Sequence, residues 1–213
     1  MTEPDTPKFV SRAGLKLHHA LDEFHINPTG WICADFGCNI GGFTDCLLQH
    51  GAARMYAIDT GYGMLDYRLR IHPQVVVMER TNALHVSAPE LVDLVVIDLA
   101  WTRQQHSIPA ALKWLKPSSS SDFRELKADG SPPLIISLVK PHYEILDSEK
   151  PLLNQGFLPH EHAHIVFQRV LENYPTLGVT PVVHAQSPLT GGKTSRKKNV
   201  PGNIEFLVLL KPV

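Results

Sequence analysis

One glycine-rich stretch constrains this chain more than any other feature of its sequence. It reads Asp35-Phe36-Gly37-Cys38-Asn39-Ile40-Gly41-Gly42-Phe43 and directly follows a short apolar run, Trp31-Ile32-Cys33-Ala34. Apolar residues then recur at helical spacing, so the pattern predicts a buried strand, a tight turn and a helix. Glycines let a ligand approach the main chain closely, and the helix start offers unpaired N–H groups. We therefore predict a ligand site at this turn, with Asp35 placed to receive a cationic or hydroxyl group.

A second acidic residue narrows the class of ligand. The run Met55-Tyr56-Ala57-Ile58 predicts another strand, and Asp59 follows it about twenty residues after the glycine turn. In nucleotide-binding α/β folds, an acid at this place holds ribose hydroxyls. The site therefore fits either a dinucleotide or S-adenosylmethionine. The glycine spacing differs from the G-x-G-x-x-G fingerprint of dinucleotide sites, and this favours S-adenosylmethionine.

The rest of the chain alternates between strand and helix patterns. The continuous apolar run at 75–78 is typical of a parallel strand covered on both faces, and further strands are predicted at 93–97, 134–139, 179–184 and 204–210. The last two strands are joined without a helix, which favours a final antiparallel hairpin. We expect a flexible N-terminus over residues 1–8 and a single α/β domain over 9–213. The polar, serine-rich segment 117–133 is expected to be a surface insertion.

Composition limits the location and the partners of the protein. No apolar run approaches the roughly 20 residues that a membrane helix needs, and the polar N-terminus resembles no signal peptide. The three cysteines are odd in number, which favours reduced thiols and a cytoplasmic location over a disulfide framework. Because the formal net charge is only −1, binding to nucleic acid would need a local basic patch.

Candidate contacts to nucleic acid are spread along the chain. The basic candidates are Arg12, Arg68, Lys193, Arg196, Lys197 and Lys198, which would contact phosphates without reading sequence. Tyr62, Trp101 and Tyr143 follow strand ends, where an unstacked base could lie on an aromatic ring. A solvated basic loop and ordinary aromatic packing remain the alternative interpretations.

Two further patterns have competing interpretations. The amide of Asn82 follows the third predicted strand, where it could contact a base edge or simply cap a turn. The alternating histidines His160, His162 and His164 suggest a metal site, but they open a predicted helix, where this spacing spreads side chains over different faces. We therefore expect no metal.

Several motifs, taken in order, resemble those of a known family. The matching stretches are Val10-Ser11-Arg12-Ala13-Gly14-Leu15-Lys16-Leu17, the loop 35–45, Ile58-Asp59-Thr60-Gly61-Tyr62-Gly63, Glu79-Arg80-Thr81-Asn82-Ala83, Val96-Ile97-Asp98-Leu99, Leu138-Val139-Lys140-Pro141, Ser187-Pro188-Leu189-Thr190-Gly191 and Gly202-Asn203-Ile204-Glu205-Phe206-Leu207. They cover residues 9–210. The chain thereby resembles the FtsJ-like RNA 2′-O-methyltransferases, and most closely the catalytic domain of the TlyA (hemolysin A-type) branch.

The resemblance implies a fold, a cofactor and a reaction. The implied fold is a Rossmann-like methyltransferase fold with a seven-stranded, mostly parallel sheet and an antiparallel last strand. The implied cofactor is S-adenosylmethionine, and the implied acceptor is a ribose 2′-hydroxyl of RNA, ribosomal RNA above all. The family's Lys-Asp-Lys-Glu catalytic set maps to Lys16, Asp98, Lys140 and Glu205. Cofactor contacts are expected from Asp35, Gly37, Gly41, Gly42, Phe43, Asp59, Asn82 and Asp98.

The residue types of this set suit methyl transfer. The reaction is an in-line displacement, so the protein must align donor and acceptor. Lys140 would take the hydroxyl proton if burial or the nearby Lys16 lowered its pKa. Asp98 would orient Lys140, and Glu205 would fix Lys16 or the ribose.

Two alternatives remain open at the level of function. TlyA-type proteins carry an N-terminal RNA-binding domain, and the methyltransferase motifs begin here by residue 9. RNA affinity is therefore expected from elsewhere or from an RNA-binding partner protein. The first alternative is a non-catalytic module that binds S-adenosylmethionine or RNA. The second, a nicotinamide-dependent oxidoreductase, is disfavoured by the glycine spacing. The oligomeric state is left open.

Overall fold

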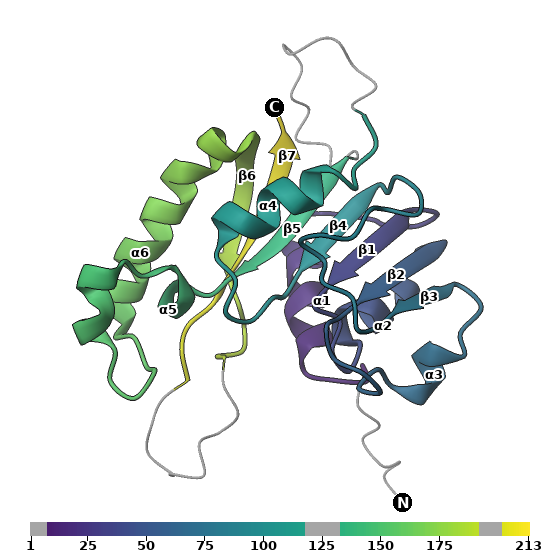
Figure 1. The fold of residues 1–213 in the computed structure, drawn as a ribbon, viewed down its shortest axis with the longest axis horizontal. Helices are drawn as coiled ribbons and strands as arrows, with labels where there is room; N and C mark the ends of the chain where they lie inside the picture. Colours follow the sequence, from purple (N-terminus) through teal and green to yellow (C-terminus); the bar gives the residue numbers. More distant parts are fainter. Residues whose placement is uncertain (1–7, 118–132, 192–201) are drawn as a thin grey trace, which may run out of the picture.

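A single seven-stranded sheet forms the centre of the protein in this computed structural model, which describes residues 8–117, 133–191 and 202–213 (Figure 1). The strands lie in the order β3-β2-β1-β4-β5-β7-β6. Their bounds are β1 (Ile32–Phe36), β2 (Arg54–Ile58), β3 (Val75–Met78), β4 (Leu94–Ile97), β5 (Leu134–Val139), β6 (Val179–Gln186) and β7 (Phe206–Pro212).

The strand directions confirm the predicted fold class. β1 pairs in parallel with both β2 and β4, and the parallel pairing continues to β3 on one side and β5 on the other. β7 inserts between β5 and β6 and runs antiparallel to both. β6 and β7 therefore form the antiparallel pair that the sequence pattern predicts.

Helices cover both faces of the sheet. One core packs α1 (Ala13–Glu23) and α2 (Gly42–Gln49) against alternate strand residues such as Leu94 and Val96. The other packs α4 (Gln104–Leu112) and α6 (His160–Asn173) against the intervening residues, such as Val95 and Ile97. The shorter helical segments are α3 (Tyr67–Arg70), α5 (Pro141–Glu144), η1 (Asp147–Leu152) and η2 (Tyr174–Leu177).

Packing on two faces explains the continuous apolar runs of the central strands. All four residues of β4 and all six of β5 are buried, because successive side chains enter opposite cores. Within the described ranges, none of the helices has the length and apolar character that crossing a lipid bilayer would require.

The fold brings the loops that carry the predicted site residues to one edge of the sheet. The order of the strands reverses at β1: β2 and β3 lie on one side of it, and β4 and β5 lie on the other. In open α/β sheets, ligands bind beyond the carboxyl ends of the strands at such a point. The glycine-rich turn after β1 and the segment after β4 meet there. Most of the segment 117–133 lies outside the described residues, so its predicted role as an insertion stays a prediction.

Candidate active site

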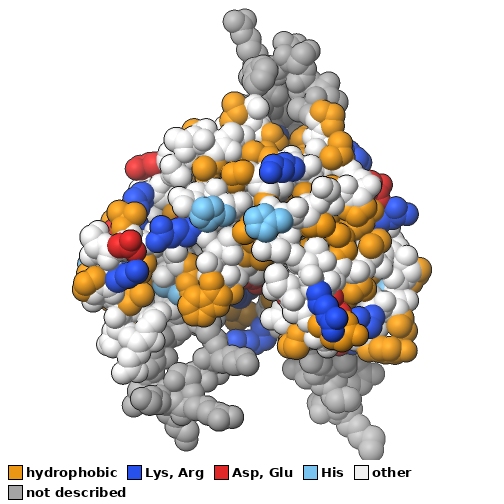
Figure 2. Space-filling model, viewed as in Figure 1, with side chains coloured by type: hydrophobic (Ala, Val, Ile, Leu, Met, Phe, Trp, Pro, Cys, Tyr) orange, Lys and Arg blue, Asp and Glu red, His pale blue; other side chains and the backbone are white. Residues whose placement is uncertain are grey.

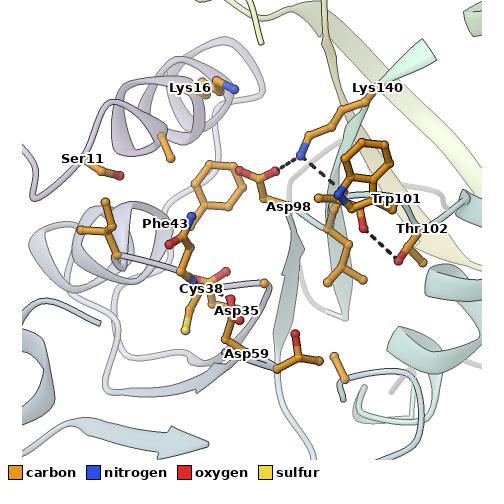
Figure 3. Close-up of a pocket in the computed structure, with 18 of the residues that line it drawn as sticks. Ser11, Lys16, Asp35, Cys38, Phe43, Asp59, Asp98, Trp101, Thr102 and Lys140 are labelled. Atoms are coloured by element: carbon orange, nitrogen blue, oxygen red, sulfur yellow. Dashed lines mark hydrogen bonds and ion pairs between the residues drawn. The ribbon is translucent and has the colours of Figure 1, made fainter. Parts of the chain in front are cut away.

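A cavity of about 870 Å³ opens beyond the carboxyl ends of β1 to β5 (Figure 3). This volume lies within the range of small-molecule sites, about 300–1,000 Å³. Its walls combine the start of α1, the turn after β1 and the segments that follow β2, β3, β4 and β5. The lining residues that sequence motifs had singled out are Arg12, Lys16, Asp35, Gly37, Phe43, Asp59, Asn82, Asp98, Trp101 and Lys140.

The turn after β1 has the tight geometry that its glycines predict. Gly37 has φ +91°, and a Cβ there would lie 2.6 Å from the carbonyl oxygen of Asp98. The amides of Gly37 and Cys38 both donate to the carbonyl of Ile58, at 2.9 and 3.0 Å. Gly37 therefore lets the β1 turn, the end of β2 and the segment after β4 approach one another closely.

Gly41 and Gly42, which are predicted to contact a cofactor, are in close contact with neighbouring helices. Neither lines the cavity among the described residues. A side chain at Gly41 would collide with Leu69 of α3, and one at Gly42 would collide with Ser11 beside α1. These two glycines thus allow α2 to pack against its neighbours, and only Gly37 of the three borders the ligand space.

Asp35 is a fully buried carboxyl group in the cavity wall. Its Oδ2 accepts hydrogen bonds from the backbone N–H (3.0 Å) and the hydroxyl (2.7 Å) of Thr44, whereas its Oδ1 has no partner. Burial raises the pKa of Asp35 to about 7, against the lowering effect of Thr44. An orphaned buried oxygen is costly in a folded protein and indicates a missing donor. Asp35 is therefore suited to a ligand that carries a positive or hydrogen-bond-donating group.

Asp59 and Asn82 stabilise the loops around the cavity. Asp59 accepts the backbone N–H of Asn39 through Oδ2 (2.9 Å) and that of Gly61 through Oδ1 (2.7 Å). The Oδ1 of Asn82 accepts the backbone N–H of Leu84 (2.9 Å), so this side chain caps a turn as well as lining the cavity.

Two lysine–carboxylate pairs lie at the far end of the cavity. Lys140 Nζ is 2.5 Å from Asp98 Oδ1 and also donates to the carbonyl of Leu99 at 3.3 Å (Figure 3). Lys16 forms the second pair with Glu205, whose side chain is only 3% exposed. The two pairs influence each other, because Lys140 and Asp98 both act on the pKa of Glu205. Four residues that are up to 189 positions apart are thus brought near enough to act on one another electrostatically.

The protonation of Lys140 differs from the sequence-based expectation. Burial alone would lower the pKa of Lys140, but the charge and hydrogen bond of Asp98 outweigh it, so the pKa lies above its ordinary value. Lys16, in turn, is paired with Glu205 and does not contact Lys140 as an uncompensated cation. Lys140 is therefore an ammonium group in this state, and it must lose a proton before it can act as a base.

Sequence reasoning missed the glycine that makes room for Glu205. A Cβ at Gly191 would overlap the Glu205 carboxylate, and the two segments are joined by a bridge between Gly191 and Asn203. The Gly191 motif was visible in the sequence, but only the strand pairing shows which carboxylate it accommodates.

Aromatic residues flank the lysine end of the cavity. Trp101 is 83% exposed and has φ +62°, a backbone conformation that is uncommon for a residue with a side chain. Its ring lies 4.9 Å from that of Tyr143, which in turn packs 4.1 Å from His142. An exposed aromatic held in this conformation beside Lys140 is available to stack on a ligand.

A pair of cross-links holds these aromatics in place. The Arg103 guanidinium donates to the carbonyl of Ile145 (2.7 Å), and the backbone N–H of Gln104 donates to Glu144 (2.9 Å). Burial raises the pKa of Glu144 to about 7. Two hydrogen bonds thus join the residues just after Trp101 to those just after Tyr143.

The predicted RNA contacts are only partly testable in the described residues. Arg12 lines the cavity mouth, whereas Lys193, Arg196, Lys197 and Lys198 lie outside the described residues. The Arg68 guanidinium pairs with Asp66 at 3.1 Å. The histidines from His160 to His164 open α6, as their spacing predicts.

Comparison with known proteins supports the same assignment of the fold. A model of the FtsJ-like methyltransferase family matches residues 9–196. The chain is 33% identical over 213 residues to the "Putative rRNA methyltransferase YqxC" of Bacillus subtilis, covering 95% of this chain and 66% of that protein. It is 36% identical over 209 residues to the "16S/23S rRNA (cytidine-2'-O)-methyltransferase TlyA" of Mycobacterium tuberculosis, covering 95% and 68%.

A solved structure shares the whole architecture. The "Putative hemolysin from Streptococcus thermophilus" superposes with a TM-score of 0.81 at 29% identity, covering 99% of this chain and 70% of that one. The chain spans about two thirds of the length of these curated relatives.

Proposed function

Because the chain belongs to the FtsJ-like methyltransferase family, we propose that it transfers a methyl group from S-adenosylmethionine to the 2′-hydroxyl of a ribose in RNA. The observation that carries the proposal is the group formed by Lys140 with Asp98 and Lys16 with Glu205 at the end of the cavity. The resemblance to the family's motifs supports these four side chains as the proposed catalytic set.

The residues around the cavity fit the proposed donor. The orphaned oxygen of Asp35 suits the ammonium group of an amino acid, and Gly37 permits close approach to the main chain. Asp59 lines the cavity at the end of β2, where an acid can accept hydrogen bonds from ribose hydroxyls. When bound, the donor supplies an electrophilic methyl group on a positively charged sulfur.

The lysine end of the cavity would serve the acceptor. Lys140 would take the proton of the ribose hydroxyl after losing its own, and Asp98 holds its amino group in place. Lys16, anchored by Glu205, would keep the ribose oriented. Trp101 and Tyr143 would hold the base of the acceptor nucleotide, since RNA bases are commonly stacked on aromatic rings.

The names of two relatives support a substrate class. Two of them are named as ribosomal RNA methyltransferases, so we extend the proposal to ribosomal RNA as the substrate and to the cytosol as the location. The three cysteines are free and buried, which agrees with a reducing compartment. We also propose a single methyltransferase domain over residues 9–213, with an RNA-binding partner or segment contributing affinity.

Transfer of radiolabel tests the proposal. The wild type, Lys140→Ala and the control Lys113→Ala, an exposed lysine after α4, are incubated with S-[methyl-³H]adenosylmethionine and ribosomal subunits or total RNA. We expect alkali-resistant, labelled dinucleotides with the wild type and the control only. Donor binding without transfer to any RNA would instead support a non-catalytic module, and a failure to bind the donor would contradict the assignment altogether.

A further inference from the structure

The segment between β2 and β3 exposes several large apolar side chains. Tyr62, Met64, Tyr67 and Ile71 are 66%, 54%, 71% and 62% exposed. Figure 2 shows hydrophobic side chains next to Lys or Arg side chains at the lower right of the molecule, where Figure 1 places α3 beside the edge strand β3. Grouped apolar side chains on a surface mark contact with another molecule.

A single arginine distinguishes this surface from a plain apolar patch. Arg80 follows β3, and its guanidinium carbon lies 4.1 Å from the centre of the Tyr62 ring. Its neighbours Arg68 and Arg70 are neutralised by Asp66 and Glu79. For Arg80, no carboxylate lies within ion-pair distance in the described ranges 8–117, 133–191 and 202–213. The stacked guanidinium therefore keeps its charge and its N–H donors available.

The Tyr62–Arg80 pair is held rigidly. The backbone N–H of Arg80 donates to the carbonyl of Gly61 (3.0 Å), and Gly63 donates to Glu79 (2.8 Å). Arg80 also has φ +52°, which is costly for a residue with a side chain and persists only when neighbouring contacts enforce it. An exposed ring fixed in this way loses little entropy when a ligand stacks on it.

The pair adjoins the cavity without belonging to it. Neither Tyr62 nor Arg80 lines the cavity, but Thr81 and Asn82, the next two residues, do. The Asp59 carboxylate connects the two regions, because it lines the cavity and accepts the backbone N–H of Gly61. A strand whose acceptor nucleotide entered the lysine end of the cavity could reach this surface, beside the Asp59 end, with nucleotides further along the strand.

We infer that Tyr62 and Arg80 bind a nucleotide that flanks the acceptor in a single-stranded RNA, an inference that rests on the proposed function. The base would stack on the exposed face of the Tyr62 ring, and the Arg80 guanidinium would donate to the adjoining phosphate. Aromatic stacking and a fixed cation are the two elements of single-strand recognition. A protein partner fits less well, because four apolar side chains are few for a standard interface of about 20–30 residues a side.

RNA binding measured directly tests the inference. Fluorescence anisotropy follows a short, labelled, mixed-sequence single-stranded RNA at several salt concentrations, with S-adenosylhomocysteine present. The variants are Tyr62→Ala and Arg80→Gln. The matched controls are Tyr62→Phe, which keeps the ring, and Arg54→Gln, which removes a cation at the opposite end of β2. Donor affinity and thermal unfolding are measured for each variant as checks on folding.

The expected results separate the two contacts. Tyr62→Ala should weaken RNA binding by about 5- to 150-fold, the range of one lost base stack. Arg80→Gln should reduce the slope of log affinity against log salt by about 0.7, the value for one phosphate contact on a single strand. Tyr62→Phe and Arg54→Gln should resemble the wild type, and donor affinity should be the same in all five proteins.

Specific outcomes overturn the inference. One is that the wild type does not bind this RNA, and another is that Tyr62→Ala binds it with wild-type affinity. The third is that the variants change only in self-association, which would assign the surface to a protein contact. Failure of the proposed function has a different signature: RNA is bound and depends on Tyr62, yet no RNA accepts a methyl group. Normal methyl transfer by Tyr62→Ala at low RNA concentration would contradict the inference while leaving the proposed function intact.

Discussion

At the scale of single residues, ionisation of Asp35 has two opposing effects: it lowers the stability of the fold and favours the binding of a cationic ligand. Its pKa is raised from 3.8 to about 7, so the folded protein keeps a proton that the unfolded chain releases near pH 4. Because of Asp35, the free energy of unfolding therefore falls as pH rises from about 4 to about 7, by up to ~4 kcal/mol. The ionised form above pH 7 is the one that suits a cationic ligand.

The variant Asp35→Asn should separate these two effects. Asn keeps the hydrogen bonds from Thr44 but carries no charge, so thermal unfolding at pH 8 should shift upward while at pH 4 it stays close to the wild type. Calorimetric affinity for S-adenosylhomocysteine should rise with pH through about 7 in the wild type and be weak and pH-independent in the variant. Asp22→Asn, an exposed control on α1, should change neither. Equal pH profiles of stability in Asp35→Asn and the wild type would contradict this account.

Asp98 should control the pH at which Lys140 becomes a base. Since the Asp98 carboxylate outweighs burial and raises the pKa of Lys140, the rate of methyl transfer should climb with pH into the alkaline range. Asp98→Asn should move this rising limb to lower pH and reduce the maximal rate, because the amide orients Lys140 less well. Glu205→Gln should move it less, since Glu205 acts more weakly on Lys140. A limb that stays in place in Asp98→Asn would exclude Lys140 as the titrating group.

At the scale of elements, the turn after β1 depends on a close contact between its backbone and the backbone at Asp98. Gly37 and Gly30 both have positive φ, but a Cβ at Gly37 would meet the Asp98 carbonyl, whereas a Cβ at Gly30 would meet nothing within 4 Å. Gly30→Ala should therefore cost only the backbone strain, about 1–2 kcal/mol. Gly37→Ala should cost more in urea denaturation and should also weaken donor binding more than tenfold. Similar losses in the two variants would show that the close contact with Asp98 is unimportant.

At the scale of the whole molecule, the two cores should unfold together. They share the strands β1, β4 and β5, whose successive side chains enter opposite faces. Trp114 lies in one core and Trp31 packs against the other. In variants that retain only one of these two tryptophans, fluorescence should report the same urea midpoint. Separate midpoints would divide the proposed domain over residues 9–213 into two units.

The local parts of the fold and site follow from sequence alone. The glycine turn, Asp35 and Asp59 were predictable because strand and turn patterns depend on residues that are neighbours in the chain. Burial on two faces explains the apolar runs of β4 and β5, whereas the apolar run of β3, predicted to be covered on both faces, belongs to an edge strand whose residues are exposed or half-buried. The four charged residues at the lysine end were located through resemblance to a family, and no pattern of spacing would have brought them together.

Only the tertiary structure decided how these groups act on one another. The charge of Lys140 depends on Asp98 outweighing burial, and the space for the Glu205 side chain depends on Gly191. The contact between Trp101 and Tyr143 joins the segments that precede α4 and form α5, which hydrogen bonds also connect. The Tyr62–Arg80 pair likewise forms between the segments after β2 and β3. Sequence determines which residues carry the chemistry, because periodicity and turn preferences are local. Distances, burial and charge states arise between distant segments, so packing alone sets them.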